Sequence, residues 1–334
     1  MTDVVAVVLW FGVTAYALFG GADFGAGFWD LVAGGEQRGR RPRALIDAAI
    51  APVWEANHVW LIFSLVVLWT AFTDAFSSLM STLFVPLTIA VFGIVLRGSG
   101  FAFLRVSTRL GARRVYGAVF ASSSLVTPFF LGAVAGGIAS GRVPVGNARG
   151  GIVASWVNPT SMLGGALAVI TCAYLSATFL VAEARRREDD ELEQYFRVRA
   201  IGAGIAAGVI ALGGIAILDP DSPRLFDRLT STALPLVALS AVCGIGALVA
   251  LVRRWVIVAT ALAAGAVATV VGGWGVAQYP FLLGTHLKLE AASAPDATLT
   301  AVLAVFGVAV VTCLPALILL YLLDQRGRLD VAEH

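Results

Sequence analysis

The sequence predicts an all-α integral membrane protein with nine transmembrane helices, and three observations support this class. The chain has 334 residues, of which 59% are hydrophobic and only 13% charged, and its mean hydropathy is +0.88. Apolar runs recur along its whole length, each long enough to cross a hydrocarbon core about 30 Å thick as a helix. The basic residues fall mainly on alternate connections between these runs. Such a composition excludes an ordinary soluble domain.

The predicted spans are apolar runs that lie between clusters of charged residues. They cover, within several residues at each end, 4–31, 46–70, 76–96, 115–139, 160–182, 200–218, 231–252, 255–278 and 299–323. The connections between them are short, so we expect one polytopic domain over residues 1–334.

The placement of the 23 basic residues predicts the orientation. All but five of them follow the odd-numbered spans, and the five exceptions are Arg142, Arg149, Arg224, Arg228 and Lys288. Arginine-rich connections stay in the cytoplasm of bacterial membrane proteins. We therefore expect the N-terminus outside and the C-terminus in the cytoplasm.

Two classes of ligand find no support in the sequence. No basic stripe interleaves with aromatic residues, so nucleic acid is not an expected partner. The only histidines, His58, His286 and His334, fall at three different levels of the predicted topology. No two of them can share a metal, and none of the three cysteines has a histidine at metal-ligand spacing. We expect no metal site in this chain.

The first predicted helix carries an acid among glycines, in the stretch LFGGADFGAGFWD from Leu18 to Asp30. At 100° per residue, one face of this helix carries Tyr16, Gly20, Asp23, Gly27 and Asp30. Gly21 and Gly25 form a GxxxG pattern on another face, which lets a neighbouring helix approach closely. A carboxylate within the membrane costs about 2.5 to 3.5 kcal/mol, so protein or water is expected to surround Asp23.

The second predicted helix carries a polar group near its start, in APVWEANHVW from Ala51 to Trp60. Glu55 and His58 are three residues apart and share a face, whereas Asn57 points elsewhere. Counted from the cytoplasmic ends of the two helices, Asp23 and Glu55 both lie roughly 12 to 14 Å deep. Two acids and an imidazole at one level are elements of a proton path. Hydrogen bonding that only joins helices is the alternative.

Three motifs resemble subunit II of the cytochrome bd-type quinol oxidases: GGADFGAGFWDL, IAPVWEANHVWLI and WGVAQYPF. Asp23 matches the acid of the family's GFDFGVG-like stretch. The family's W-[DE]-x-N-x-V-W stretch is matched by Trp54, Glu55, Asn57, Val59 and Trp60. The segment RGSGFAFLR, from Arg97 to Arg105, departs from the family run R-P-x-x-F-E-F-R, and His58 stands where glutamine is common.

The resemblance implies a heterodimer in which subunit I holds haems b and d and the quinol site, and subunit II holds no haem. It implies two four-helix bundles plus a peripheral helix, with a first bundle at about 4–139 and a second at about 160–252 that 255–323 completes. It also implies that subunit II can hold a structural quinone and that its acids form part of a proton route from the cytoplasm.

By this resemblance no residue of the chain is directly catalytic. The proton path is expected to use Asp23 and Glu55, with Asn57 and His58 beside them. Helix and subunit packing is expected to use Gly20, Gly21, Gly25, Gly27, Trp54 and Trp60.

The function expected is therefore that of subunit II in a respiratory oxidase of the bacterial inner membrane, which reduces oxygen to water with quinol. Expected partners are subunit I, quinol and lipid. The sequence leaves open whether the quinol is menaquinol or ubiquinol, and whether a small single-helix accessory subunit joins the complex. The alternatives are a secondary transporter or ion-translocating subunit, motivated by the same intramembrane acids, and a purely structural scaffold.

Overall fold

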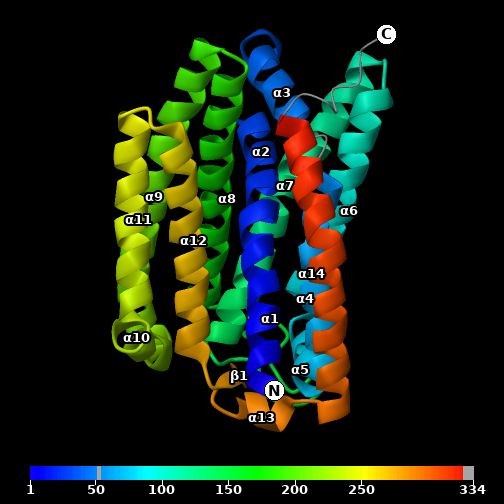
Figure 1. Ribbon diagram of the computed structural model, residues 1–334, viewed down its shortest axis with the longest axis vertical. Helices are drawn as coiled ribbons and strands as arrows, with labels where there is room; N and C mark the ends of the chain where they lie inside the picture. The colour runs from blue at the N-terminus through cyan, green and yellow to red at the C-terminus, as the bar shows by residue number, and fades with distance from the viewer. Residues whose placement is uncertain (51–53, 326–334) are drawn as a thin grey trace.

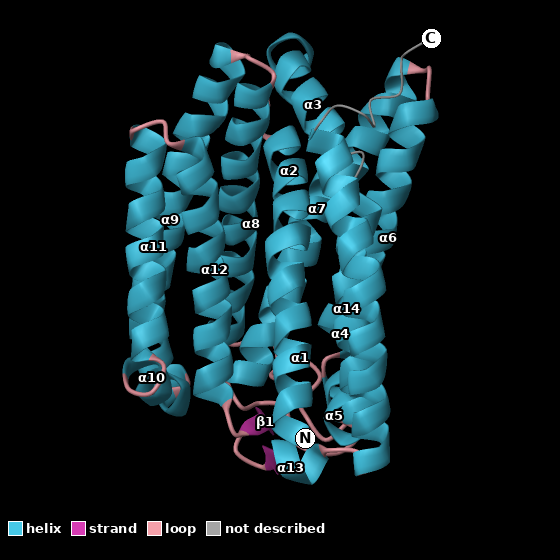
Figure 2. Ribbon diagram, viewed as in Figure 1, coloured by secondary structure: helices cyan, strands magenta, loops and turns pink. Residues whose placement is uncertain are grey.

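The computed structural model describes residues 1–50 and 54–325, and nearly all of them are helical (Figures 1 and 2). The long helices run side by side along the longest axis of the molecule. The chain begins at one end of the molecule, where Figure 1 marks the N-terminus, and α14 (Asp296–Gln325) runs from that end toward the other.

The elements follow one another as α1 (Thr2–Ala15), the π-helix η1 (Tyr16–Gly20), α2 (Gly21–Leu31), α3 (Glu36–Ile50), α4 (Trp54–Ala71), α5 (Thr73–Thr82), α6 (Phe84–Val106), α7 (Leu110–Ala139), α8 (Pro159–Arg186), α9 (Asp190–Asp221), α10 (Pro223–Thr230), α11 (Leu234–Val252), α12 (Val256–Gln278), β1 (Phe281–Leu283), β2 (Leu287–Lys288), α13 (Leu289–Ala292) and α14 (Asp296–Gln325). The two short strands pair antiparallel, with Phe281 opposite Lys288. They lie with α10 and α13 at the end where the chain begins (Figure 2).

The predicted membrane fold is confirmed. Within the described residues, 8 helices are long and apolar enough to cross a membrane, and the pair Gln37–Ile50 and Trp54–Ala71 makes a ninth if it is counted as one span. This pair is bent by 54°, and it covers the span predicted at 46–70, of which residues 51–53 lie outside the described part of the chain.

The span predicted at 76–96 has the wrong boundaries. The chain forms the short helix α5 first, and the membrane helix α6 begins at Phe84 and continues to Val106. Arg97, which the charge pattern assigns to a connection, is therefore an interior residue of α6. The helix continues past Arg97 despite the low helix propensity of Gly98 and Gly100, because the apolar segment FAFL follows and because the guanidinium finds partners inside the protein.

Helix starts follow ordinary capping chemistry. Asn158 precedes α8, its side chain accepts a hydrogen bond from Ser161 N–H at 2.9 Å, and Pro159 takes the first helical position. Asp189 caps α9 in the same way by accepting from Leu192 N–H at 3.0 Å. These caps place the beginnings of both long helices at polar connections.

The continuous span α1, η1 and α2 contacts helices on several sides. Its α2 part contacts both α7 and α8, while α6 packs on α7 and α9 packs on α8. Helix α14 contacts α4 and α1 at the edge of the molecule (Figure 1), and none of its most apolar 18-residue window is buried. The expected division into two bundles stays a prediction.

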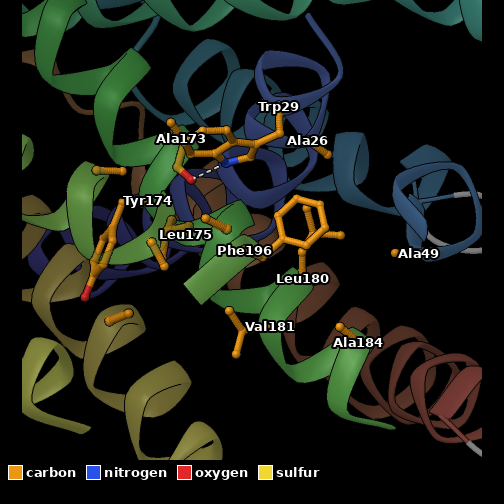
Figure 3. Close-up of a cluster of buried hydrophobic side chains, with 14 of the residues drawn as sticks. Ala26, Trp29, Ala49, Ala173, Tyr174, Leu175, Leu180, Val181, Ala184 and Phe196 are labelled. Carbon is orange, nitrogen blue, oxygen red and sulfur yellow. Dashed lines mark hydrogen bonds between the residues drawn. The ribbon is translucent and has the colours of Figure 1, made fainter. Parts of the chain in front are cut away.

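The largest buried apolar cluster lies where α2 meets α8, and Figure 3 shows part of it. The indole nitrogen of Trp29 donates a hydrogen bond of 2.8 Å to the carbonyl of Ala173. A Cβ atom on Gly25 would lie 1.8 Å from the carbonyl oxygen of Cys172. The two backbones therefore approach closely at a position where only glycine fits.

A methyl group at Gly25 should separate these two helices. We expect Gly25→Ala to lower the free energy of unfolding by about 1 to 3 kcal/mol or more, because the backbone of α8 cannot yield as a side chain would. The measurement is the thermal unfolding midpoint of the purified protein in detergent.

Gly21→Ala is the matched control, because a Cβ there would meet nothing nearer than the Leu175 side chain at 3.4 Å. Equal losses for Gly21→Ala and Gly25→Ala would contradict the close approach.

Candidate functional site

A buried ion pair joins α2 to α6. The Nη2 atom of Arg97 lies 2.8 Å from Oδ1 of Asp23, and the side chains are 1% and 2% exposed respectively. The same Nη2 donates to the carbonyl oxygen of Asp23 at 3.0 Å, and Nε donates to Ser124 Oγ at 3.0 Å. The carboxylate that the sequence analysis singled out therefore has a fixed cationic partner.

Aromatic rings enclose the guanidinium of Arg97. Its central carbon lies 5.1 Å from the ring centroid of Phe24 and 4.9 Å from that of Phe120. Such cation–π contacts are favourable when the cation is desolvated. The arginine is thus held by two aromatic rings and by hydrogen-bond acceptors from Asp23 and Ser124.

Glycines create the space for this arrangement. A Cβ on Gly27 would lie 2.2 Å from Ser124 Oγ, the hydroxyl that accepts from Arg97. A Cβ on Gly100 would lie 3.0 Å from backbone atoms of α7 at Tyr116 and Phe120. Close contact of α2, α6 and α7 therefore lets a charged pair lie inside protein rather than in lipid.

Three buried polar atoms, one of the pair itself and two beside it, have no hydrogen-bond partner among the described residues. They are Oδ2 of Asp23, Oη of Tyr16 and Nδ1 of His58. The rings of Tyr16 and His58 are 6.1 Å apart, and each lies within 6.4 Å of the Phe24 ring. We call Tyr16, Asp23 and His58 the polar cluster.

The residues predicted from the second motif take different positions on α4. Asn57 is buried and His58 is partly buried against Tyr16 and Phe24, whereas Glu55 is exposed on the surface of the chain. Trp54 packs on α6, with its ring 5.6 Å from that of Phe101. The ring of Trp60 lies on α1 and η1, 5.6 Å from Phe11 and 6.4 Å from Phe19.

The first and second motifs meet through α6. Arg97 binds Asp23, and at the next residue, Gly98, a Cβ would lie 3.3 Å from the ring of Trp54, which precedes Glu55. The residue that contacts Asp23 is thus Arg97 rather than Glu55. The sequence did not predict this role of Arg97, because an arginine after an apolar run resembles a cytoplasmic anchor. The apolar segment GFAFL that follows Arg97 was the signal for a longer helix.

The glycines of η1 and α2 lie against different neighbours. Gly25 lies against α8 at Cys172, and Gly21 faces the same helix at Leu175. Gly27 lies against Ser124 of α7. A Cβ on Gly20 would lie 2.7 Å from the Tyr16 ring, so this glycine lets the ring lie across the helix at the π-turn.

Salt bridges connect the helices at the end that carries α3. Arg43 Nε lies 3.0 Å from Asp30 Oδ1, which ties α3 to α2. Arg41 pairs with Asp189 at 2.8 Å and also with Glu191, which ties α3 to the start of α9. The Asp189 carboxylate accepts from the Leu192 backbone N–H and lies beside Arg41, and both contacts hold its pKa below its usual range.

In the described part of the chain, no group of three or more His, Cys, Asp or Glu side chains is placed to hold a metal ion. The polar side chains described above include acids, a hydroxyl and an imidazole. Such groups bind and transfer protons.

Comparisons with known proteins agree over nearly the whole chain. The family model described as cytochrome bd terminal oxidase subunit II matches residues 1–323. A Bacillus subtilis (strain 168) protein named cytochrome bd ubiquinol oxidase subunit 2 is 28% identical over 244 residues, which are 70% of this chain and 69% of that protein. A second protein of that strain, named putative cytochrome bd menaquinol oxidase subunit II, is 23% identical over 201 residues, 59% of this chain and 56% of its own length.

A solved structure shows the same fold. In the structure of bd oxidase from Geobacillus thermodenitrificans, one chain superposes with a TM-score of 0.79 at 24% sequence identity. The match covers 96% of this chain and 97% of that chain. The arrangement of helices described above is therefore shared from end to end.

Removal of the cation from the buried pair should destabilise the protein strongly. We expect Arg97→Met to lower the free energy of unfolding by about 3 to 5 kcal/mol, because it leaves the Asp23 carboxylate buried without a partner. Thermal unfolding of the purified protein in detergent measures this loss.

The double variant Asp23→Leu with Arg97→Met is the control, because it removes both charges. It should recover most of the lost stability. A double variant as unstable as Arg97→Met alone would show that packing of the arginine, rather than its charge, is what matters.

Proposed function

Since the chain belongs to the cytochrome bd terminal oxidase subunit II family, and is thus one subunit of a multi-subunit quinol oxidase, we propose that it supplies part of the oxidase's proton path. The enzyme is an oxidoreductase of the bacterial membrane, and reduction of oxygen to water consumes protons as well as electrons. The path runs from the cytoplasm past Asp23 and Glu55, with Asn57 and His58 beside them. The protons are delivered to the partner subunit.

The observation that carries this proposal is the exposure of Glu55 on α4. A carboxylate within a membrane-spanning segment that faces lipid costs about 2.5 to 3.5 kcal/mol, so such groups face protein or water instead. A partner subunit that covers α4 would remove this cost. Glu55 would then lie at the subunit interface, where it can pass a proton from this chain to its partner.

The contacts of α6 support the same route. Asp23 contacts Arg97, and the next residue of α6 lies against Trp54, immediately before Glu55. Helix α6 therefore contacts both Asp23 and the residue that precedes Glu55. The orientation that gives the path a cytoplasmic entrance follows from the arginine-rich connections.

The haems and the quinol site belong, in this proposal, to the partner subunit. Haem b and haem d would lie in subunit I, with quinol oxidised near the outer face, and this chain would bind neither haem. The two Bacillus subtilis relatives are named for ubiquinol and for menaquinol, so both quinols stay open. A structural quinone in this chain and a small single-helix accessory subunit are further parts of the proposal.

A scaffold role is the second candidate, and the geometry of Asp23 favours it for that residue. One carboxylate oxygen is engaged by Arg97, which would hold α2 and α6 together whether or not protons pass. A transporter role has no comparable observation in its favour, since the family is that of an oxidase subunit. Glu55 therefore provides the sharper test.

We expect Glu55→Gln to slow quinol-dependent oxygen consumption by the intact complex roughly tenfold, which corresponds to about 1.4 kcal/mol of barrier. The amide keeps the size of the side chain but cannot carry a proton. Haem content and the yield of the assembled complex should stay near normal.

Glu290→Gln is the matched control, because Glu290 is also exposed but lies on α13 at the opposite end of the molecule from α3 (Figure 1). It should not change turnover. Full turnover of Glu55→Gln with intact haem would instead favour the scaffold.

A further inference from the structure

A groove lies between α9 and α11, on the edge of the molecule away from α4 and α14 (Figure 1). Its volume is about 280 Å³. Five apolar side chains and one arginine line it, and they are Ile201, Ile205, Leu248, Val249, Val252 and Arg253. The first two belong to α9, and the others belong to α11 or follow its last residue. The groove is therefore apolar along its length and cationic at one end.

Glycines leave space on the same two helices beyond the groove. The helices touch at Gly204 of α9, where a Cβ would lie 2.9 Å from Cδ2 of Leu248. Gly208 of α9 and Gly244 of α11 continue, at helical spacing, the faces that line the groove. A Cβ at either of these two glycines would meet nothing within 4 Å. An open apolar seam thus extends about 13 Å along α11 from Arg253 to Gly244.

Two arginines at the end of this seam have no partner. In the described part of the chain, the side chains of Arg253 and Arg254 make no hydrogen bond and no ion pair. The turn that carries them is fixed by the N–H of Trp255, which donates to the carbonyl of Ala250 at 2.8 Å. Arg185 adds a third guanidinium, whose Nη1 donates to the carbonyl of Arg254 at 2.6 Å. The chain itself therefore leaves positive charge unbalanced at the mouth of the groove.

A ligand that matches both features has an anionic group and a hydrocarbon chain. Guanidinium groups bind phosphate through paired hydrogen bonds. Basic pockets between membrane helices on the cytoplasmic side bind anionic lipid headgroups, and the arginine-rich connections predict that this turn is cytoplasmic. Trp255, next to the two arginines, is 57% exposed, and exposed tryptophans are typical of the level of the headgroups.

We propose that the groove between α9 and α11 binds an anionic phospholipid of the cytoplasmic leaflet. The phosphate lies on Arg253 and Arg254, and one acyl chain lies along the apolar seam between the helices. A quinone does not use this end of the groove, because its headgroup carries no charge for the arginines to balance. A helix of another subunit, about 10 Å across, is too wide to enter the groove. The bound lipid contacts both helices and stabilises their association, because it binds only the folded protein.

The test uses the complete oxidase complex, purified in detergent and freed of native lipid. Native mass spectrometry measures the fraction of the complex that carries added phosphatidylglycerol. We expect Arg253→Gln to weaken this binding roughly fivefold, the effect of one charge near an anionic headgroup. Val249→Trp fills the groove with an exposed side chain and keeps both arginines, so it should weaken binding at least as much. Phosphatidylcholine with the same acyl chains should bind more weakly, because its headgroup has no net charge.

Arg40→Gln is the matched control, because Arg40 is also an exposed arginine but lies on α3, outside the groove. It should leave phosphatidylglycerol binding unchanged. Haem content and quinol-dependent oxygen consumption should stay normal in all three variants, since neither Arg253 nor Val249 belongs to the proposed proton path. Normal values show that a loss of lipid does not come from misfolding.

Four results would overturn the proposal. Equal phosphatidylglycerol binding by the unmodified complex, Arg253→Gln and Val249→Trp would show that the lipid binds elsewhere. Weaker binding by Arg253→Gln but not by Val249→Trp would show a surface charge contact that does not use the groove. Equal binding of phosphatidylcholine and phosphatidylglycerol would remove the role of the arginines. Displacement of phosphatidylglycerol by an equal concentration of glycerol 3-phosphate, which lacks acyl chains, would show a site for free phosphate rather than for a lipid.

Discussion

The ion pair between Asp23 and Arg97 is the interaction on which the packing of the first membrane helix depends. A carboxylate or a guanidinium alone would be costly at this depth, and the two together are tolerated because each meets several further partners. Ser124, the Asp23 carbonyl and two aromatic rings surround the arginine. The pair therefore determines where α2, α6 and α7 contact one another.

Glycine makes this packing geometrically feasible. In a membrane the helices gain little from burying apolar surface, because lipid tails are equally apolar, so association depends on close contact and hydrogen bonds. Gly25 brings α2 against α8, and Gly27 brings it against Ser124 of α7. Trp29 adds a hydrogen bond to the α8 backbone. The same residues that enclose the acid thus also hold the bundle together.

Much of the outer surface remains apolar and uncovered by the chain itself. Helix α14 exposes its most apolar window completely, as expected of a helix that contacts lipid or another subunit. The exposed carboxylate of Glu55 differs from this apolar surface, because lipid tails would not solvate it. Asp23 is enclosed by protein and Glu55 is open, which is why we propose that Glu55 is the acid that transfers protons to the partner.

The sequence by itself determined the fold class and the family. Hydropathy is a local property, so the apolar runs could be read from composition alone, and the motifs around Asp23 and Glu55 were sufficient for the resemblance to bd oxidase subunit II. What hydropathy could not show was the partner of Asp23. Arg97 lies far from it in the chain, and next to an apolar run an arginine looks like a cytoplasmic anchor.

Only the tertiary structure decided which polar groups meet. It paired Asp23 with Arg97, brought His58 to Tyr16 and left Glu55 on the surface. The physical reason is that these outcomes depend on how closely α2, α6 and α7 approach and on the rotation of α4. Those quantities follow from contacts between residues distant in sequence, which no local pattern encodes.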